Sequence, residues 1–332
     1  MSYTPSYIEL FKSGELSARA EKLNTLLADC NICPKDCKVN RLNNEIAACY
    51  SRHLPVVSSY CVHYGEEPLL SGSIEKNNFK GIGNIFFGNC NLRCVYCQNY
   101  EISQNHREEI QNEVTIKRLA EIMIELQSRN VNAVGFVSPT HFVPQIVAAL
   151  VIASDEGFNL PLIYNNNSYD SVEVLRFLEG VIDIYLPDLK YSDEQTGYQY
   201  SKIKNYVYHS RESLKEMYRQ TGSRLVIEND LLKRGLLVRH LILPNDLAGS
   251  YDTLKFISEL DNKISISVMS QYYPVHKALS IDLLSRNIRE REYEKVLLWM
   301  DELNLQNGFI QEYESENYYR PDFKDRVEPF KR

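Results

Sequence analysis

The sequence predicts an α/β protein, a partial (β/α)6 barrel of the TIM type with an N-terminal cysteine-rich metal-binding element. Two observations favour the barrel: short apolar runs alternate with helical patterns from residue 81 to about residue 275, and there are six such runs. Strands that alternate with helices form parallel βαβ units, and six units are fewer than the eight of a closed barrel. A third observation, that all eight cysteines lie before residue 98, separates the start of the chain from the rest.

The first two expected strands enclose an amphipathic helix. Residues 81–89, "GIGNIFFGN", read as a buried strand that leads directly into a loop with three cysteines. In residues 115–130 the apolar side chains recur every three or four positions, which predicts a helix with one buried face. Residues 132–137 form the second expected strand. A helix follows in which Pro144 suits the first turn and Gly157 suits the C-terminal cap.

The same alternation continues to residue 269. Four more strands are expected, at residues 160–165, 181–190, 235–245 and 263–269. Helices are expected after Asp170, around residues 210–222 and from about Ser250. We therefore predict three regions: a cysteine-rich metal-binding region 1–75, the barrel 76–280, and a C-terminal helix with a tyrosine-rich extension 281–332.

Composition and charge limit the functions that the chain can have. The net charge is −7 and no long block of Lys and Arg occurs, so we expect no nucleic-acid partner. No apolar run approaches the roughly 20 residues that span a bilayer, and the first residues show no signal peptide, so we expect a cytoplasmic protein without a membrane partner. In a reducing compartment, eight cysteines favour metal or redox chemistry over disulfides.

The loop "GNCNLRCVYCQNY", residues 88–100, carries Cys90, Cys94 and Cys97 with the spacing Cys-x3-Cys-x2-Cys. Three thiolates are one short of a closed zinc site, whereas they hold three of the four irons of a [4Fe–4S] cluster. One iron then stays open to a ligand that is not protein, as in a reactive metal site. The alternatives are a zinc site completed by a distant residue, or cysteines that merely pack in the core.

This loop resembles the cluster loop of the radical S-adenosylmethionine (radical SAM) superfamily, including Tyr96 just before the last cysteine, and the resemblance places Tyr96 among the residues that bind S-adenosylmethionine. The string "CNLRCVYCQN" is especially similar to activating enzymes of the pyruvate formate-lyase type. The resemblance implies an oxidoreductase in which S-adenosylmethionine binds the fourth iron. It also implies cleavage to methionine and a 5′-deoxyadenosyl radical, which abstracts hydrogen from a substrate; the protein supplies geometry and excludes water.

The resemblance also assigns residues at successive strand ends to S-adenosylmethionine. Where the family often has a Gly-Gly-Glu motif, this chain has "VSPTHF", so Ser138 and Thr140 are substitute candidates. "YNNNSYD" gives Asn165, Asn167 and Ser168, and "LPDLK" gives Asp188 and Lys190. "LVRHLILP" gives Arg239, whose planar fork suits the methionine carboxylate, while Met269 and Gln271 are placed near the adenine or the substrate.

The segment "CNICPKDCKVNRLNNEIAAC" supplies a second set of cysteines, Cys30, Cys33, Cys37 and Cys49. Four thiols within 20 residues form a complete ligand set for zinc or for a closed iron–sulfur cluster, and the spacing leaves both metals open. Together with "HYGEEP" and "GFIQEYESENYYRPDF", this segment resembles a branch of pyruvate formate-lyase activating enzyme-like iron–sulfur proteins.

Several other polar residues have two interpretations. His63, Glu66 and Glu67 in "HYGEEP" are candidates to line the substrate side or to bind the backbone of the cluster loop. For the two glutamates we expect a solvated acidic turn, with a paired-carboxylate acid/base site as the alternative. Cys61 is expected to be a packing residue. His141 either caps a helix or faces the substrate. His240 points to the opposite side of its strand from Arg239 and is expected in the core.

The leading functional hypothesis is a radical SAM enzyme that abstracts hydrogen from a substrate, with a glycyl-radical-type protein as a candidate partner. A protein or peptide substrate and a small molecule both stay open. An electron donor such as flavodoxin or ferredoxin is expected. The alternative is a non-catalytic iron–sulfur electron carrier or redox sensor, which has no need of polar residues at six successive strand ends.

Overall fold

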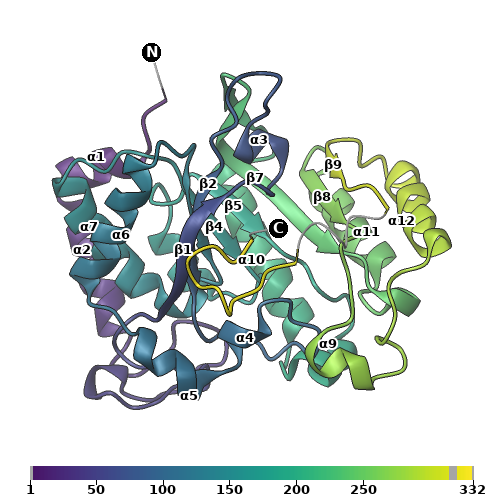
Figure 1. The fold of residues 1–332 in the computed structure, drawn as a ribbon, viewed down its shortest axis with the longest axis horizontal. Helices are drawn as coiled ribbons and strands as arrows, with labels where there is room; N and C mark the ends of the chain where they lie inside the picture. Colours follow the sequence, from purple (N-terminus) through teal and green to yellow (C-terminus); the bar gives the residue numbers. More distant parts are fainter. Residues whose placement is uncertain (1–2, 314–319, 331–332) are drawn as a thin grey trace.

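The computed structural model describes residues 3–313 and 320–330. A mostly parallel β-sheet lies at the centre of the structure (Figure 1). The strand order is β1-β2-β3-β4-β5-β7-β8-β9, and β6 pairs with β7 outside this path. The strands are β1 Val57–His63, β2 Ile82–Phe87, β3 Val134–Val137, β4 Leu162–Asn166, β5 Ile184–Pro187, β6 Val226–Glu228, β7 Leu231–Leu241, β8 Ser265–Met269 and β9 Gly308–Ile310.

Helices connect these strands and cover the sheet. The α-helices are α1 Tyr7–Lys12, α2 Glu15–Thr25, α3 Pro68–Ser71, α4 Tyr100–Ser103, α5 His106–Glu109, α6 Ile116–Ser128, α7 Val143–Asp155, α8 Val172–Phe177, α9 Glu194–Ser201, α10 Tyr206–Thr221, α11 Ser250–Asp261 and α12 Glu290–Glu302. Short 3-10 helices include η1 Arg41–Asn43 and η3 Thr140–Phe142. The expected helix 115–130 is α6, and the Thr115 side chain caps it by accepting from the Arg118 amide.

The six expected strands correspond to β2, β3, β4, β5, β7 and β8, which pair in parallel in that order. The predicted α/β fold with a mostly parallel sheet is therefore confirmed, and its order is consistent with a partial barrel. Two further strands extend it: β1 pairs antiparallel with β2, and β9 pairs parallel with β8.

The beginning of the chain packs against the barrel helices. α1 and α2 contact α7, and Tyr7, Leu16 and Leu23 are fully buried in the same core as the barrel helices. In Figure 1 these helices gather with α6 at one end of the sheet, and α11 and α12 cover the other end. The division into three regions stays a prediction, because packing alone does not define domain boundaries.

Alternate residues of the central strands face two different cores, because side chains of a strand alternate between its faces. On the inner face, Ile163, Leu186 and Leu237 belong to a small apolar cluster under α3. Their neighbours Tyr164, Tyr185 and Val238 belong to the large core beneath the helices. The residues two positions later on the inner face, towards the carboxyl ends of the strands, are polar: Asn165, Asp188 and Arg239.

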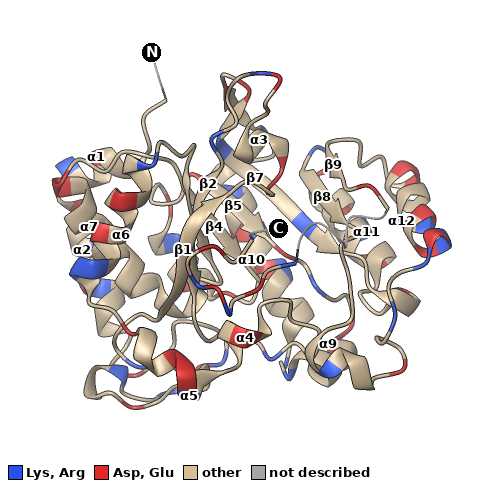
Figure 2. Cartoon of the chain, in the orientation of Figure 1, with Lys and Arg blue, Asp and Glu red and all other residues tan. Residues whose placement is uncertain are grey.

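No helix in the described ranges is long and apolar enough to cross a membrane. Charged residues of both signs are interspersed along the outer helices, most visibly on α12 (Figure 2).

Candidate functional site

The three-cysteine loop begins directly after β2. Cys90 and Cys94 are buried, Cys97 is half-buried, and all three are free thiols. Asn89 turns the chain into the loop with a left-handed φ of 64°. A side chain at the preceding Gly88 would place its Cβ 2.5 Å from Val56, so the close approach of this segment requires glycine.

Hydrogen-bond donors surround the three thiols. The Ser201 hydroxyl lies 3.0 Å from Cys94 Sγ, and Asn167 Nδ2 lies 3.5 Å from Cys90 Sγ. The Ser103 hydroxyl is 3.2 Å from Cys97 Sγ. Donors of this kind stabilise sulfur that carries negative charge, as cysteine does when it ligates iron. Ser103 and Ser201 were missed from the sequence, because neither stands in a pattern that marks it.

Burial and one cation set the electrostatics of the loop. Burial raises the pKa of the Cys94 thiol to about 12, and the Lys190 ammonium acts in the opposite direction. The pKa of Cys97 is also raised by burial, again against Lys190. Lys190 is therefore placed to offset negative charge that gathers on these thiols.

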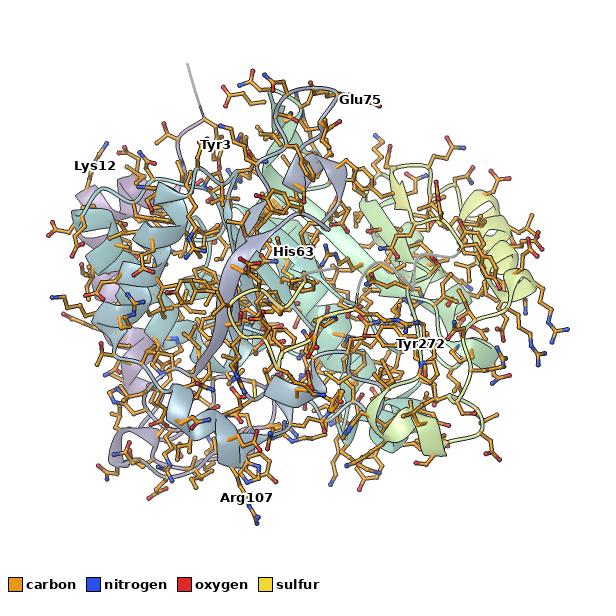
Figure 3. The ribbon with its side chains drawn as sticks, viewed as in Figure 1. Tyr3, Lys12, His63, Glu75, Arg107 and Tyr272 are labelled. Carbon is orange, nitrogen blue, oxygen red and sulfur yellow. The ribbon has the colours of Figure 1, made fainter. Side chains whose placement is uncertain are left out.

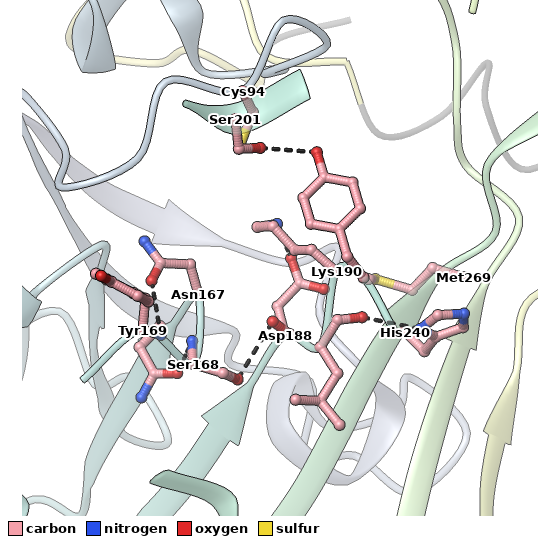
Figure 4. Close-up of polar contacts among 12 residues, drawn as sticks. Cys94, Asn167, Ser168, Tyr169, Asp188, Lys190, Ser201, His240 and Met269 are labelled. Carbon is pink, nitrogen blue, oxygen red and sulfur yellow. Dashed lines mark hydrogen bonds and ion pairs between the residues drawn. The ribbon is translucent and has the colours of Figure 1, made fainter. Parts of the chain in front are cut away.

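Lys190 forms an ion pair with Asp188, and Figure 4 shows the two side chains below Cys94 and beside the segment Asn167–Tyr169. Burial by itself lowers the pKa of Lys190, but Asp188 and Cys94 outweigh it and hold the pKa above its ordinary value. The other oxygen of Asp188, Oδ1, is buried without a hydrogen-bond partner among the described residues. A buried carboxylate oxygen of this kind is an acceptor available to a ligand.

An inner cavity of about 200 Å³ brings most of the predicted residues together. The three cysteines lie on one side of it. The predicted S-adenosylmethionine contacts that line it are Tyr96, Ser138, Asn165, Asn167, Asp188 and Arg239, and Lys190, Met269 and Gln271 join them. The strand-end residues meet here because the carboxyl ends of parallel strands share one edge of the sheet.

Arg239 is held by two carboxylates from the loop after β1. Its Nε donates to Glu67 Oε1 at 2.9 Å, and its Nη2 donates to both Glu66 and Glu67. The side chains of Glu66 and Glu67 are only 10% and 8% exposed, so the expected solvated acidic turn is wrong. Burial alone raises the pKa of Glu66, but Arg239 outweighs it and lowers that pKa to about 2.

A glycine makes room for this ion-pair cluster. Asn84 Nδ2 donates to Glu66 Oε1 at 2.7 Å across the inner face of β2. A Cβ at Gly135 on the neighbouring strand would come within 2.2 Å of Asn84 Oδ1. Gly135 is the glycine inside the predicted strand "NAVGFV", and a glycine within a strand often marks such a close approach.

A larger cavity of about 590 Å³ adjoins the inner one, and Gln98, Asn165, Arg239 and Gln271 line both. His63 and Phe330 lie on its wall with their rings 4.0 Å apart. Figure 3 labels His63 near the centre of the view, beside the C-terminal segment that carries Phe330. The inner cavity, which the three cysteines line, therefore adjoins a space large enough for a second molecule.

Other candidates lie outside these cavities. Thr140 is buried in η3 and lines neither of them. His240 is fully buried, bonded to the Leu189 carbonyl and the Ser250 hydroxyl, as expected of a core histidine (Figure 4). Cys61 is buried in a cluster with Phe86 and Phe323.

Within residues 3–313 and 320–330, no three His, Cys, Asp or Glu side chains are already spaced to hold a single metal ion. A [4Fe–4S] cluster makes a different demand, since each cysteine binds a separate iron. Three free thiols on one cavity wall, donors aimed at their sulfurs and an orphaned Asp188 oxygen fit a cluster with a polar ligand beside it.

Comparison with known proteins agrees with this chemistry. Residues 84–225 match the family model described as the radical SAM superfamily. The chain contains a radical SAM superfamily domain. Membership of the superfamily implies a [4Fe–4S] cluster and S-adenosylmethionine. Enzymes of the superfamily cleave S-adenosylmethionine with an electron from the cluster. The matched range runs from β2 to the residue just before β6 and contains the three-cysteine loop.

Two relatives come from Methanocaldococcus jannaschii. The chain is 32% identical over 308 residues to uncharacterized protein MJ0674, covering 90% of this chain and 82% of that protein. It is 29% identical over 167 residues to uncharacterized protein MJ0808, covering 48% of each. These two relatives link the chain to similar proteins without naming a substrate.

Among solved structures, the chain is similar to HydG, a maturase of the [FeFe]-hydrogenase, with a TM-score of 0.48 and 15% identity over 96% of this chain and 68% of that one. It is also similar to Streptococcus suis SuiB bound to precursor peptide SuiA, with a TM-score of 0.46 and 13% identity. That match covers 68% of this chain, which spans about half, 47%, of the SuiB chain.

Proposed function

We propose that this chain is a radical SAM enzyme of the pyruvate formate-lyase activating enzyme-like branch, with Cys90, Cys94 and Cys97 as the ligands of its [4Fe–4S] cluster. One observation carries the proposal: three free thiols and the inner-face polar residues of three parallel strands line one cavity. When bound, cluster and cofactor supply a 5′-deoxyadenosyl radical, formed with methionine by one-electron cleavage of a carbon–sulfur bond, that takes a hydrogen atom from the substrate.

The residues of the inner cavity have distinct roles in this proposal. Ser138, Asn165 and Asn167 offer neutral hydrogen-bond donors and acceptors to the methionine part of the cofactor. The orphaned Oδ1 of Asp188 accepts from its amino group, a role that the sequence resemblance gave to Ser138 and Thr140. Lys190 offsets the charge of the ligating thiolates.

Arg239 keeps one edge of its guanidinium for the methionine carboxylate. Glu66 and Glu67 occupy Nε and Nη2, and no hydrogen bond of Nη1 is found among the described residues. The two carboxylates hold the guanidinium rigid and in its plane, so that Nη1 is oriented before a ligand arrives.

The larger cavity is the proposed substrate site, because it adjoins the inner cavity and shares Arg239 and Gln271 with it. The sequence resemblance supports a glycyl-radical-type protein partner, and a small molecule is the alternative. An electron donor such as flavodoxin or ferredoxin and a cytoplasmic location complete the proposal. A non-catalytic electron carrier or redox sensor would have no use for a second cavity beside the cluster.

The test is an anaerobic assay of reconstituted protein with dithionite and S-adenosylmethionine. We expect 5′-deoxyadenosine and methionine in equal amounts from the wild-type protein. A Cys94→Ala variant should form at least about 100-fold less product, since the cluster loses one of its three ligands. Cys61→Ser, which changes a buried cysteine that lines neither cavity, is the matched control and should keep the activity. Wild-type protein with an intact three-cysteine cluster but without product would refute the proposal.

A further inference from the structure

The four N-terminal cysteines form one cluster. Cys30, Cys33 and Cys49 are buried, Cys37 is half-buried, and all four are free thiols. Cys30 and Cys37 lie within hydrogen-bonding reach of each other, and Cys33 interacts with Cys30, Cys37 and Cys49. These four side chains, spread over 20 positions of sequence, are therefore neighbours, although no three of them in the described structure have the spacing that a single metal ion requires.

Backbone amides approach these sulfurs. The N–H groups of Ile32, Lys35 and Ala48 face the thiols of Cys30, Cys33 and Cys37, respectively, as backbone amides do in loops that hold metal-bound sulfur. The loop adopts left-handed backbone at Asp36 and Lys38, with φ of 45° and 59°. Non-glycine residues in this region are strained, and such strain gathers at ligand-binding loops.

A buried cation completes the case. Arg41 in η1 is fully buried, and no carboxylate in the described part of the chain lies within ion-pair distance of it. Its Nη1 donates to the His141 carbonyl at 2.7 Å, its Nε donates to the Arg52 carbonyl at 2.9 Å, and its Nη2 is buried with no nitrogen or oxygen acceptor among the residues that the structure describes. The guanidinium faces Cys30. A buried positive charge requires a counter-charge, which neutral thiols do not offer.

We propose that Cys30, Cys33, Cys37 and Cys49 bind a metal centre as thiolates, and that this centre stabilises the fold of the radical SAM cysteine loop. Because no three of these side chains in the described part of the chain are spaced to hold a single metal ion, an iron–sulfur core, in which each cysteine binds a separate iron, fits them better than zinc. A tetrathiolate iron–sulfur core carries a net negative charge, so it neutralises Arg41. The support of the loop rests on the proposed function of Cys90, Cys94 and Cys97, whereas metal binding at the N-terminal site does not.

Arg93 connects the two sites directly. Its Nη2 donates to the Ala48 carbonyl at 3.3 Å, its Nη1 donates to the Cys90 carbonyl, and its guanidinium stacks 4.7 Å above the ring of Tyr50. Ala48 therefore presents its N–H to Cys37 and its carbonyl to Arg93. The connection from Cys37, at the N-terminal site, to the backbone of Cys90, at the three-cysteine loop, therefore runs through Ala48 and the Arg93 side chain.

Two further connections reach the same loop. Arg41 holds the His141 carbonyl, and His141 Nε2 lies 3.0 Å from the Gly88 carbonyl, just before the loop. On the other side, Tyr169 lies near Cys33 and Cys37, and its carbonyl accepts from Asn91 Nδ2 at 2.9 Å. Cys90 is thus flanked by contacts that originate at the N-terminal cysteines, so loss of metal there should loosen the loop.

The experiment measures iron, sulfide and zinc per chain, together with the electron paramagnetic resonance (EPR) signal of the dithionite-reduced protein. Wild-type protein should hold a metal centre beyond the three-cysteine cluster, and the elements identify it as zinc or iron–sulfur. Cys33→Ser should lose this centre and, in addition, most of the EPR signal that S-adenosylmethionine perturbs. Cys94→Ala should lose only the three-cysteine cluster, and Cys61→Ser should lose neither.

Arg93→Ala tests the coupling with all seven ligands intact, in case Cys33→Ser does not fold. It should keep the N-terminal metal and yet lower the occupancy of the three-cysteine cluster several-fold. The metal proposal is overturned if Cys33→Ser holds the same metals as the wild type. The coupling is overturned if Cys33→Ser or Arg93→Ala keeps the full perturbable signal. Absence of 5′-deoxyadenosine from wild-type protein would instead refute the proposed function and leave these metal contents unchanged.

Discussion

At the scale of single residues, the cavity is built by side chains that alternate along each strand. The cysteine loop could be predicted from its spacing alone, and Asn165, Asp188 and Arg239 follow from strand alternation once the strand ends are known. The partners of Arg239 could not be predicted. Glu66 stands 173 positions away in sequence, and nothing local shows that its loop folds over the sheet.

Asn167 offers a test of how the protein tunes the cluster. Its amide donates to Cys90 Sγ at 3.5 Å, and hydrogen bonds to a cluster's sulfurs favour the reduced, more negative state. Asn167→Ala should therefore lower the reduction potential of the three-cysteine cluster, by on the order of tens of mV. The measurement is a redox titration followed by EPR without S-adenosylmethionine.

Asn165→Ala is the matched control for this titration. Asn165 lines the same cavity, but no hydrogen bond from its side chain to a cysteine is found among the described residues. A potential that is unchanged in Asn167→Ala, or that falls equally in both variants, would contradict a specific role for the amide at Cys90.

At the scale of elements, the central strands could be predicted because each is an apolar run that ends at a turn. β1 and β9 could not be predicted in the same way. β9 is three residues long with an exposed end, and β1 belongs to a region whose cysteines dominate its pattern. Their place at the two sides of the parallel strands depends on distant pairing, which leaves no periodic signal in a short segment.

Asp183, just before β5, joins three elements and makes the stability depend on pH. It accepts hydrogen bonds from Tyr3 Oη and from the Ser6 and Leu162 amides. Burial raises its pKa from 3.8 to about 6, although these hydrogen bonds act in the opposite direction. The folded state then binds the proton more tightly than the unfolded state, so this contribution to stability is present at low pH and falls as pH rises to about 6.

Asp183→Asn should remove this dependence. The free energy of unfolding should be measured by urea unfolding at about pH 5 and about pH 7 for both proteins. Between these pH values the wild type should lose more free energy of unfolding than Asp183→Asn. Asp183→Asn should itself lower the free energy of unfolding by about 1–3 kcal/mol, because the hydrogen bonds to the amide are weaker than those to the carboxyl group. The exposed Asp252→Asn serves as the control. A wild type whose stability rises over this interval relative to Asp183→Asn would show that the sign is wrong.

At the scale of the whole molecule, the two ends of the chain pack against different parts of the barrel: the first described residues bond to Asp183 just before β5, and the last described residues lie along β1. The C-terminal segment runs along β1 (Figure 1), where Arg326 pairs with the fully buried Glu109 and Phe323 packs against Phe86. The expected tyrosine-rich extension lies partly outside the described residues. Composition predicted a tyrosine-rich tail after the barrel. It did not predict which part of the barrel the tail covers, because the packing of the tail depends on a few contacts with residues far away in the sequence.

The most direct test of the account uses S-adenosylmethionine that carries ¹³C in its carboxylate and ¹⁵N in its amino group. Electron–nuclear double resonance is recorded on the reduced, reconstituted protein. We predict hyperfine coupling from both labels to the three-cysteine cluster, because the open iron binds these two groups. The coupling should vanish in Cys94→Ala. A reduced cluster that is intact and shows no coupling to either label would contradict the central claim that Cys90, Cys94 and Cys97 leave one iron for the cofactor.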